Sequence, residues 1–297
     1  MSDSYLSPLT ASDGDNIAVQ DWPFTDNGLE GDIARGTILI VHGLGEHAQR
    51  YAALADEINY WGYTVRSYDQ YGHGESAGQR GGLPRTSRLL DDLTDVVDST
   101  RRLMGPDEPL ILLGHSLGGV VATQFVLHKI RKVDGLILSS PAFDPGLSIL
   151  QKLLLAVVPK IAPNLSLSNG LNRQYLCRDA DVVEEYQNDP LVHDRISPRL
   201  AQWLAVQGRA CITLAPTLSV PTLLLFAGTD RLVSETGSRI FADVATRRLM
   251  TVKYFEPMYH DILNDPERDQ VLAALQDWLA GSFIKNPAAA ASRLRAG

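Results

Sequence analysis

The chain has few cysteines, no cluster of basic residues and no long uninterrupted hydrophobic run. Its 297 residues include two cysteines, Cys177 and Cys211, with no CxxC pair and no Cys/His spacing suited to zinc. We therefore expect two buried thiols in a reduced compartment rather than a disulfide. The sequence predicts neither a metal site nor a cofactor, because the glycine-rich stretch 72–78 matches no nucleotide-binding motif.

Charge and hydropathy narrow the possible partners. Lysine and arginine number 27 against 35 aspartates and glutamates, a net charge of −8, so nucleic acid is not an expected partner. The most apolar window, 147–165, is interrupted by two lysines and two prolines and is too broken to span a bilayer. The first eight residues lack the basic start and apolar run of a signal peptide, and we expect a cytoplasmic protein.

Short β-rich runs alternate with helical patterns along most of the chain. This alternation predicts an α/β fold with a mostly parallel central sheet and helices on both faces. The expected strands are 37–41, 63–68, 110–113, 133–139, 222–226 and 250–255. The expected helices are 50–61, 89–103, 118–129, 235–245 and a last helix with Asp265 as N-cap and Pro266 at its first position.

The alternation lapses between residues 144 and 212, which we call the cap segment. We expect residues 1–143 and 213–285 to form the core, the cap segment to be a helical insertion over a site, and residues 286–297 to be a disordered tail. Apolar residues favour a cap with a hydrophobic underside; they are Leu150, Leu153, Leu154, Leu155, Val157 and Val158. The alternative is a pair of helices that buries its own core.

A candidate nucleophile lies in Gly114-His115-Ser116-Leu117-Gly118, a G-x-S-x-G pattern. An apolar strand leads into it and a helix-compatible run leaves it. Such a sharp strand-to-helix turn exposes the serine hydroxyl at a helix N-terminus, and the glycines keep Cβ atoms out of the crowded corner. We expect Ser116 to be the nucleophile.

A serine needs a base and an acid, which follow it in the order acid, then histidine, in hydrolases with this turn. His260 follows the last expected strand and is the expected base, since His193 falls inside the cap segment. Asp230 directly follows strand 222–226 and is the expected acid. Asp69 also follows a strand and is its rival, whereas we expect Asp261 to be solvated.

Two backbone amides must also stabilise the oxyanion. One is expected from Leu117, the residue after the nucleophile. The other is expected from Leu44, because glycines on both sides let the backbone of His42-Gly43-Leu44-Gly45 turn its amide inward. We expect His42 to brace this loop rather than to act in catalysis.

These residues resemble the α/β-hydrolases of the monoacylglycerol lipase and lysophospholipase group. Residues 42–51 are similar to the family's HGxGEHxxRY loop, 69–76 to its DxxGHGxS segment and 114–119 to its GHSxGG elbow. Residues 228–231 and Tyr259-His260 resemble its acid and histidine loops, and 188–192 its end-of-cap segment. The resemblance covers nearly the whole chain and is weakest over 146–178.

The resemblance implies an α/β-hydrolase fold, a Ser116–Asp230–His260 triad and an oxyanion hole from Leu44 and Leu117. It also implies that Glu46, His47 and Arg50 border the polar end of the pocket, although Glu46 and Arg50 are spaced for a simple helical ion pair. The expected activity is cleavage of monoacylglycerols to fatty acid and glycerol. The cap is expected to contact micelles or membranes transiently, peripheral to the membrane.

Other functions share this triad. A lysophospholipase has the same acyl end and a different headgroup pocket, and a general carboxylesterase acts on short or medium acyl chains. A peptidase of the same fold is not distinguished by the triad alone. A non-enzymatic binding protein of this fold usually lacks a triad member, and none is missing here.

Overall fold

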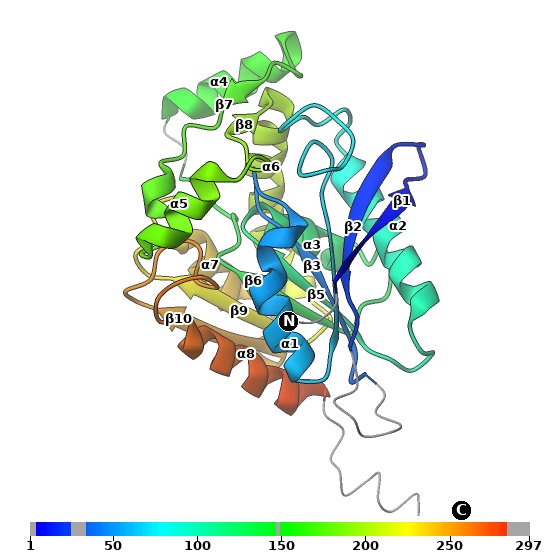
Figure 1. Cartoon of the computed structure of the whole chain (residues 1–297). Helices are drawn as coiled ribbons and strands as arrows, with labels where there is room; N and C mark the ends of the chain where they lie inside the picture. The colour runs from blue at the N-terminus through cyan, green and yellow to red at the C-terminus, as the bar shows by residue number, and fades with distance from the viewer. Residues whose placement is uncertain (1–3, 25–33, 147–148, 284–297) are drawn as a thin grey trace, which may run out of the picture.

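One eight-stranded sheet runs through the molecule (Figure 1). The structure is a computed structural model that describes residues 4–24, 34–146 and 149–283. In sheet order the strands are β1 (Tyr5–Thr10), β2 (Asn16–Trp22), β4 (Thr64–Tyr68), β3 (Thr37–Val41), β5 (Leu110–His115), β6 (Gly135–Ser139), β9 (Thr222–Ala227) and β10 (Met250–Phe255). The strands from β4 to β10 pair in parallel, whereas β1 and β2 are antiparallel. The predicted α/β-hydrolase fold class is confirmed.

Helices cover both faces of the sheet. The main helices are α1 (Ala52–Tyr60), α2 (Arg88–Leu103), α3 (Leu117–Leu127), α4 (Ile149–Ile161), α5 (Ala180–Asn188), α6 (Pro198–Leu214), α7 (Glu235–Val244) and α8 (Arg268–Phe283). Ile38 and Ile40 of β3 pack with α1 and α8, whereas Leu39 and Val41 pack with α2, α3, α6 and α7. The central strands are therefore apolar on both faces, which explains why they lack polar alternation.

Two expectations about the ends of the chain differ from the structure. Strands β1 and β2 were not expected. β1 contains Pro8 and lies half-exposed at the sheet edge, where no continuous apolar run is needed. β2 is buried, but Gln20 and Asp21 interrupt its apolar run. The predicted start of the last helix was wrong. That helix begins at Arg268, two residues after the predicted first position; the Asp265 carboxylate accepts the Glu267 amide at 3.0 Å and also pairs with Arg178 of the cap segment.

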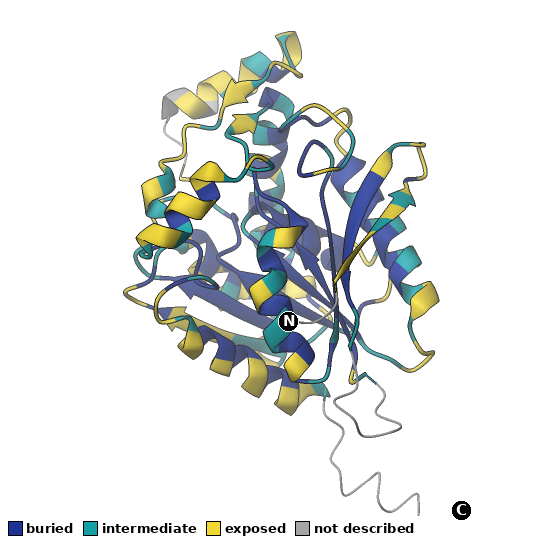
Figure 2. Cartoon of the chain, in the orientation of Figure 1, coloured by how far each residue is buried: buried dark blue, intermediate teal, exposed yellow. Residues whose placement is uncertain are grey.

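The cap segment contains α4, α5, most of α6, the short helix η2 (Arg173–Tyr175) and a two-stranded ribbon of β7 (Leu167–Ser168) and β8 (Arg195–Ile196). The expected boundary at residue 212 falls inside α6. Leu200, Trp203 and Cys211 of α6 belong to the main core, whereas α4 is largely exposed (Figure 2). The Leu150 side chain and residues 286–297 lie outside what the structure describes.

Both cysteines are free and buried, as predicted. Burial raises the pKa of the Cys177 thiol to about 12, which keeps it protonated. Within the described residues, no helix has both the length and the apolar character needed to cross a membrane.

Candidate active site

Ser116 occupies a strained turn between β5 and α3. Its backbone has φ 51° and ψ −116°, a conformation that few residues other than glycine adopt. The turn is crowded: a Cβ at Gly118 would lie 2.0 Å from the Val41 carbonyl oxygen, and one at Gly114 would lie 2.5 Å from the Gly118 oxygen. The two glycines are therefore required by close backbone approach, as the sequence predicts.

His260 and Asp230 are joined by a hydrogen bond. His260 Nδ1 lies 2.7 Å from Asp230 Oδ2, and both side chains are about 95% buried. Asp230 follows β9, and its Oδ1 accepts the amide hydrogens of Leu232 and Val233 at 2.8 and 2.9 Å. The carboxylate is thus held by its own loop and leaves the other oxygen for the histidine.

The surroundings of this pair shift the pKa values of both groups, as expected when a carboxylate orients a histidine base. Burial alone would lower the pKa of His260, but the charge and hydrogen bond of Asp230 raise it above its ordinary value. Burial alone would raise the pKa of Asp230, but His260 and the two loop amides lower it. Asp230 therefore stays ionised and favours the protonated imidazole.

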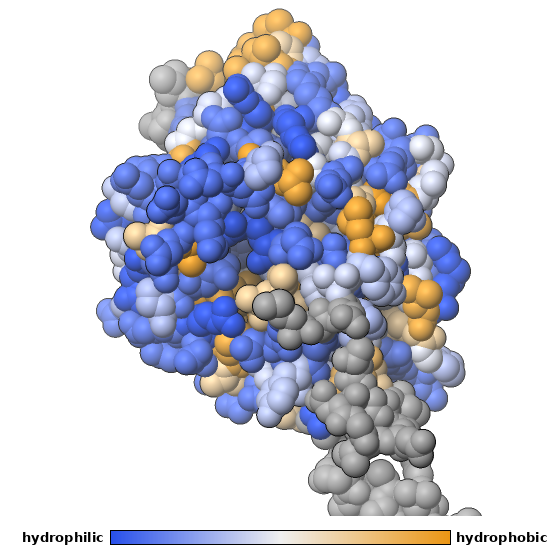
Figure 3. Space-filling view, in the orientation of Figure 1, coloured by the Kyte–Doolittle hydropathy of each residue, from blue (hydrophilic) through white to orange (hydrophobic). Residues whose placement is uncertain are grey.

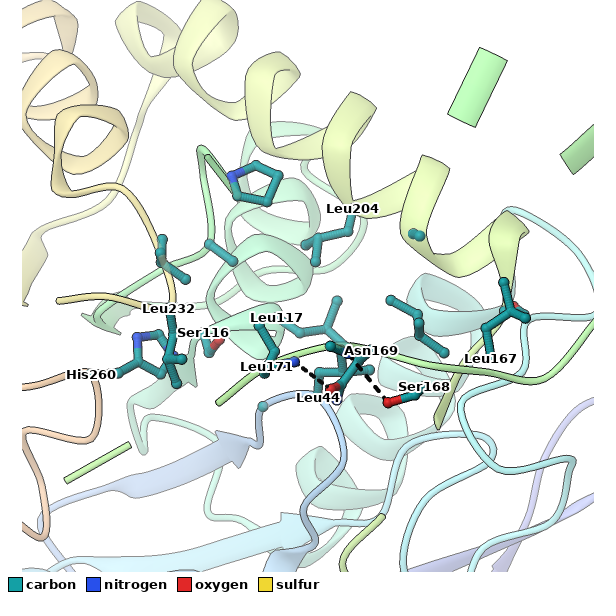
Figure 4. Close-up of a pocket in the computed structure, with 18 of the residues that line it drawn as sticks. Leu44, Ser116, Leu117, Leu167, Ser168, Asn169, Leu171, Leu204, Leu232 and His260 are labelled. Atoms are coloured by element: carbon teal, nitrogen blue, oxygen red, sulfur yellow. Dashed lines mark hydrogen bonds between the residues drawn. The ribbon is translucent and has the colours of Figure 1, made fainter. Parts of the chain in front are cut away.

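Ser116 and His260 line the same cavity (Figure 4). These two residues, both described, are not joined by a hydrogen bond; in pairs of this kind the catalytic hydrogen bond often tightens only in the complex with substrate. The ring of His115 packs 4.9 Å from that of His260, and its Nδ1 lies 3.1 Å from Ser139 Oγ. His115 thus packs against the imidazole, a contact that the sequence pattern did not indicate.

Leu44 and Leu117 also line the cavity beside Ser116 (Figure 4). Within the described part of the chain, no protein group accepts the amide hydrogen of either residue. Both amides are therefore open to an acceptor in the cavity. His42 hydrogen-bonds to Gly43 and Gln70, as expected of a residue that braces this loop.

Of Glu46, His47 and Arg50, all three described, Glu46 alone lines the cavity. Its Oε1 accepts hydrogen bonds from the Gly43 amide at 2.5 Å and the Tyr51 hydroxyl at 2.8 Å, and its Oε2 lies 3.5 Å from Arg50. His47 Nε2 lies 2.7 Å from Asp189, in the cap segment. Both oxygens of the Glu46 carboxylate thus have partners within the protein.

The rival residues are engaged elsewhere. Asp69 accepts the amides of Ala48 and Glu75, and His193 lies against the Gly72 carbonyl. The expectation that Asp261 is solvated was wrong. Its side chain is buried, 4.0 Å from Arg50, because the histidine loop folds inward after His260.

The cavity has a volume of about 510 Å³, within the range of small-molecule sites. Its walls are mostly apolar and come from α4, β7, the loop after β7 and α6; they include Leu154, Leu155, Val158, Leu167, Leu171 and Leu204. Polar side chains gather at Glu46, Arg173 and Tyr186. The sequence did not single out Arg173 or Tyr186, because the contribution of each depends on how the cap segment folds.

Tyr186 connects the cap segment to the charged side chains around Glu46. Its ring lies 4.7 Å from the Arg50 guanidinium and 5.7 Å from that of Arg173.

Among the residues described, no group of three or more histidine, cysteine, aspartate or glutamate side chains is arranged to hold a metal ion. The cavity therefore offers an apolar slot, a polar end and a serine beside an acid–histidine pair.

Residues 32–267 match the family model described as "Serine aminopeptidase, S33". The chain is 31% identical over 254 residues to a monoacylglycerol lipase of Mycolicibacterium smegmatis, covering 82% of this chain and 88% of that protein. It is 34% identical over 242 residues to the phospholipase YtpA of Bacillus subtilis, covering 80% and 92%.

A solved structure is similar along nearly its whole length. The crystal structure of a Paleococcus ferrophilus monoacylglycerol lipase superposes with a TM-score of 0.77 at 31% identity, covering 94% of this chain and 99% of that one. The chain belongs to the S33 serine hydrolase family and is a serine ester hydrolase, an α/β-hydrolase of the monoacylglycerol lipase and lysophospholipase group.

Proposed function

We propose that the protein hydrolyses monoacylglycerols to fatty acid and glycerol through an acyl-enzyme on Ser116. The observation that carries this proposal is the cavity, which Ser116 and His260 line together with apolar side chains of the cap segment and the polar side chains of Glu46, Arg173 and Tyr186. A single acyl chain suits the slot, and a small hydroxylated alcohol suits the polar end. The relatives named above as monoacylglycerol lipases support the same substrate class.

In this mechanism His260 takes the proton of the Ser116 hydroxyl as Oγ attacks the ester carbonyl. The amides of Leu44 and Leu117 donate hydrogen bonds to the tetrahedral oxyanion. His260 then protonates the departing alcohol, and the acyl group stays on Oγ. A water molecule, deprotonated by His260, repeats the attack and releases the fatty acid, while Asp230 stabilises the imidazolium in both steps.

A lysophospholipase is the second candidate, and one observation favours it. Arg173 lines the cavity, and no carboxylate of the described chain lies within ion-pair distance of its guanidinium. Asp194 is close enough for Arg173 to help lower its pKa, but it pairs with Arg195 at 3.2 Å. A guanidinium without a carboxylate partner would suit a phosphate on the leaving alcohol.

The test is fatty acid release from monoacylglycerols of increasing chain length. Lysophospholipids of the same acyl chains and short soluble esters are run alongside, with Ser116→Ala as the blank. Ser116→Ala is expected to lose about 10⁶-fold in kcat while keeping its fold. A maximum on medium or long monoacylglycerols supports the proposal. A maximum on lysophospholipids would identify the protein as a lysophospholipase, and a maximum on short esters would identify it as a general carboxylesterase.

We also propose that the protein works in the cytoplasm and meets membranes through α4. Leu153, Val157 and Ile161 recur every four residues on this helix and are 62, 53 and 78% exposed. Figure 3 shows hydrophobic surface at the end of the molecule that α4 occupies in Figure 1. Such a face suits shallow contact with lipid, which would bring the cavity near its substrate.

A further inference from the structure

Three residues from separate parts of the chain meet where the cap segment touches the acid and histidine loops. Arg231 directly follows Asp230, Tyr259 directly precedes His260, and Tyr175 belongs to η2. The Arg231 guanidinium lies 4.7 Å from the centre of the Tyr175 ring and 5.8 Å from that of Tyr259. The two rings meet edge to face, 6.2 Å apart. We call Tyr175, Arg231 and Tyr259 the aromatic clasp.

The Arg231 side chain is held by its contacts with the rings of Tyr175 and Tyr259. Across the described residues, no carboxylate lies within ion-pair distance of Arg231, although it is next to Asp230 in the sequence. Arg239, in contrast, contacts the Tyr254 ring at 4.4 Å and also pairs with Glu235. A guanidinium contacts aromatic rings with its planar face, which an ammonium group lacks.

The segment after Tyr175 continues this contact along the histidine loop. The Asp261 amide donates to the Leu176 carbonyl at 2.8 Å, and the Cys177 thiol donates to the Asn264 carbonyl at 3.2 Å. Arg178 pairs with Asp265 at 2.5 Å. The two residues that flank His260 in the sequence, Tyr259 and Asp261, thus both contact the cap segment.

We infer that Arg231 is a positioning residue, which links the place of η2 in the cap segment to the geometry of the Asp230–His260 pair. Arg231 is one peptide bond from Asp230, and Tyr259, whose ring centre lies 5.8 Å from the Arg231 guanidinium, is one peptide bond from His260. A shift of Tyr175 therefore acts on both loops at once. Ser116 and His260 must approach for proton transfer, so small displacements of the histidine loop change the rate. This inference rests on the proposed triad.

The test compares Arg231→Gln, Arg231→Lys and Tyr175→Ala on p-nitrophenyl acetate, a soluble ester too short to need the acyl slot. All three are expected to lower kcat about 10- to 100-fold, with KM changed by less than about twofold. Arg231→Lys should fall as far as Arg231→Gln, because it keeps the charge and loses the planar stack. Tyr175→Phe, which keeps the ring, should restore wild-type kcat.

The pH profile separates positioning from charge. If Arg231 acted on His260 only through its charge, Arg231→Lys would keep full activity and Arg231→Gln would move the acid limb upward, since a neighbouring cation disfavours imidazolium. Either result overturns the inference. The inference predicts a lower plateau with the acid limb in place.

Two controls complete the experiment. Arg239→Gln removes an arginine–tyrosine contact outside the cavity and should leave kcat unchanged; an equal loss there would contradict the inference. Thermal midpoints show whether each variant is folded. A wild type inactive on every ester would refute the proposed function itself, whereas an active wild type with unaffected Arg231 variants would refute the clasp alone.

Discussion

Gly43 donates its amide hydrogen to Glu46 Oε1 at 2.5 Å, across the loop that contains Leu44. The same oxygen accepts from the Tyr51 hydroxyl, and Arg50 balances the charge of the other. Burial alone would raise the pKa of Glu46, but His115, Arg50 and the Gly43 amide among others lower it, so the carboxylate stays ionised. Glu46 thus holds the loop in one conformation.

Glu46→Ala should therefore impair turnover more than binding. The Gly43 amide would lose its acceptor and the Leu44 amide would shift, which we expect to lower kcat about 10²-fold. Steady-state kinetics on a monoacylglycerol and on a short ester measure this effect, with the exposed Glu185→Ala as the matched control. A rise in KM confined to the glycerol ester, with kcat intact, would instead identify Glu46 as a headgroup-binding residue.

The acid limb of the pH–rate profile should report His260. Asp230 raises the pKa of His260 above its ordinary value, about 6.5, so the base is lost as pH falls through that higher value. Asp230→Asn should lower kcat about 10⁴-fold and move the remaining acid limb to lower pH. The profile of kcat/KM between pH 5 and 9 tests this, and His128→Gln, on the surface, should change nothing.

Charge on α4 should separate lipid contact from catalysis. Replacing Val157 and Ile161 with aspartate places two charges on an exposed face whose side chains do not line the cavity. We expect weaker binding to liposomes and slower hydrolysis of micellar substrate, with unchanged activity on soluble esters. Leu103→Asp, an exposed leucine on α2, is the control. Equal losses on soluble and micellar substrates would contradict the proposed membrane contact.

Gly118→Ala should destabilise the whole fold. The added Cβ would lie 2.0 Å from the Val41 carbonyl oxygen, in rigid backbone, and we expect a loss of about 3 kcal/mol in the free energy of unfolding. Gly281→Ala in α8 adds a Cβ with nothing within 4 Å and should gain about 0.5 kcal/mol. Urea unfolding curves measure both. A neutral Gly118→Ala would show that the elbow relaxes.

Much of the fold was predictable because the central strands are buried on both faces. The strand at 37–41 was predicted with its observed bounds, since its apolar run ends at glycines. The start of α8 was predicted two residues early: the local pattern indicated that Asp265 accepts an amide of the first turn, but not that its carboxylate is also bound by Arg178, a residue 87 positions away. Signals that depend on one segment could be found in the sequence, and contacts between distant segments could not.

The same distinction applies to the candidate site. Ser116, Asp230 and His260 each follow a predicted strand, so their meeting at one edge of the sheet could be expected. Arg173 and Tyr186 lie in the cap segment, where no periodic pattern fixes the orientation of a side chain. Their place in the cavity depends on how that segment packs over the core.

The packing of α6 divides the cap segment into two parts with different stabilities. Trp203 and Cys211 are shared with the main core, so α6 cannot leave without exposing that core, whereas α4 buries little. Backbone amides of α6 should then exchange with solvent only when the whole protein unfolds, and those of α4 should exchange much earlier. We therefore expect α4 to open locally while α6 stays packed, so that a movement of α4 that admits substrate would cost little of the protein's global stability.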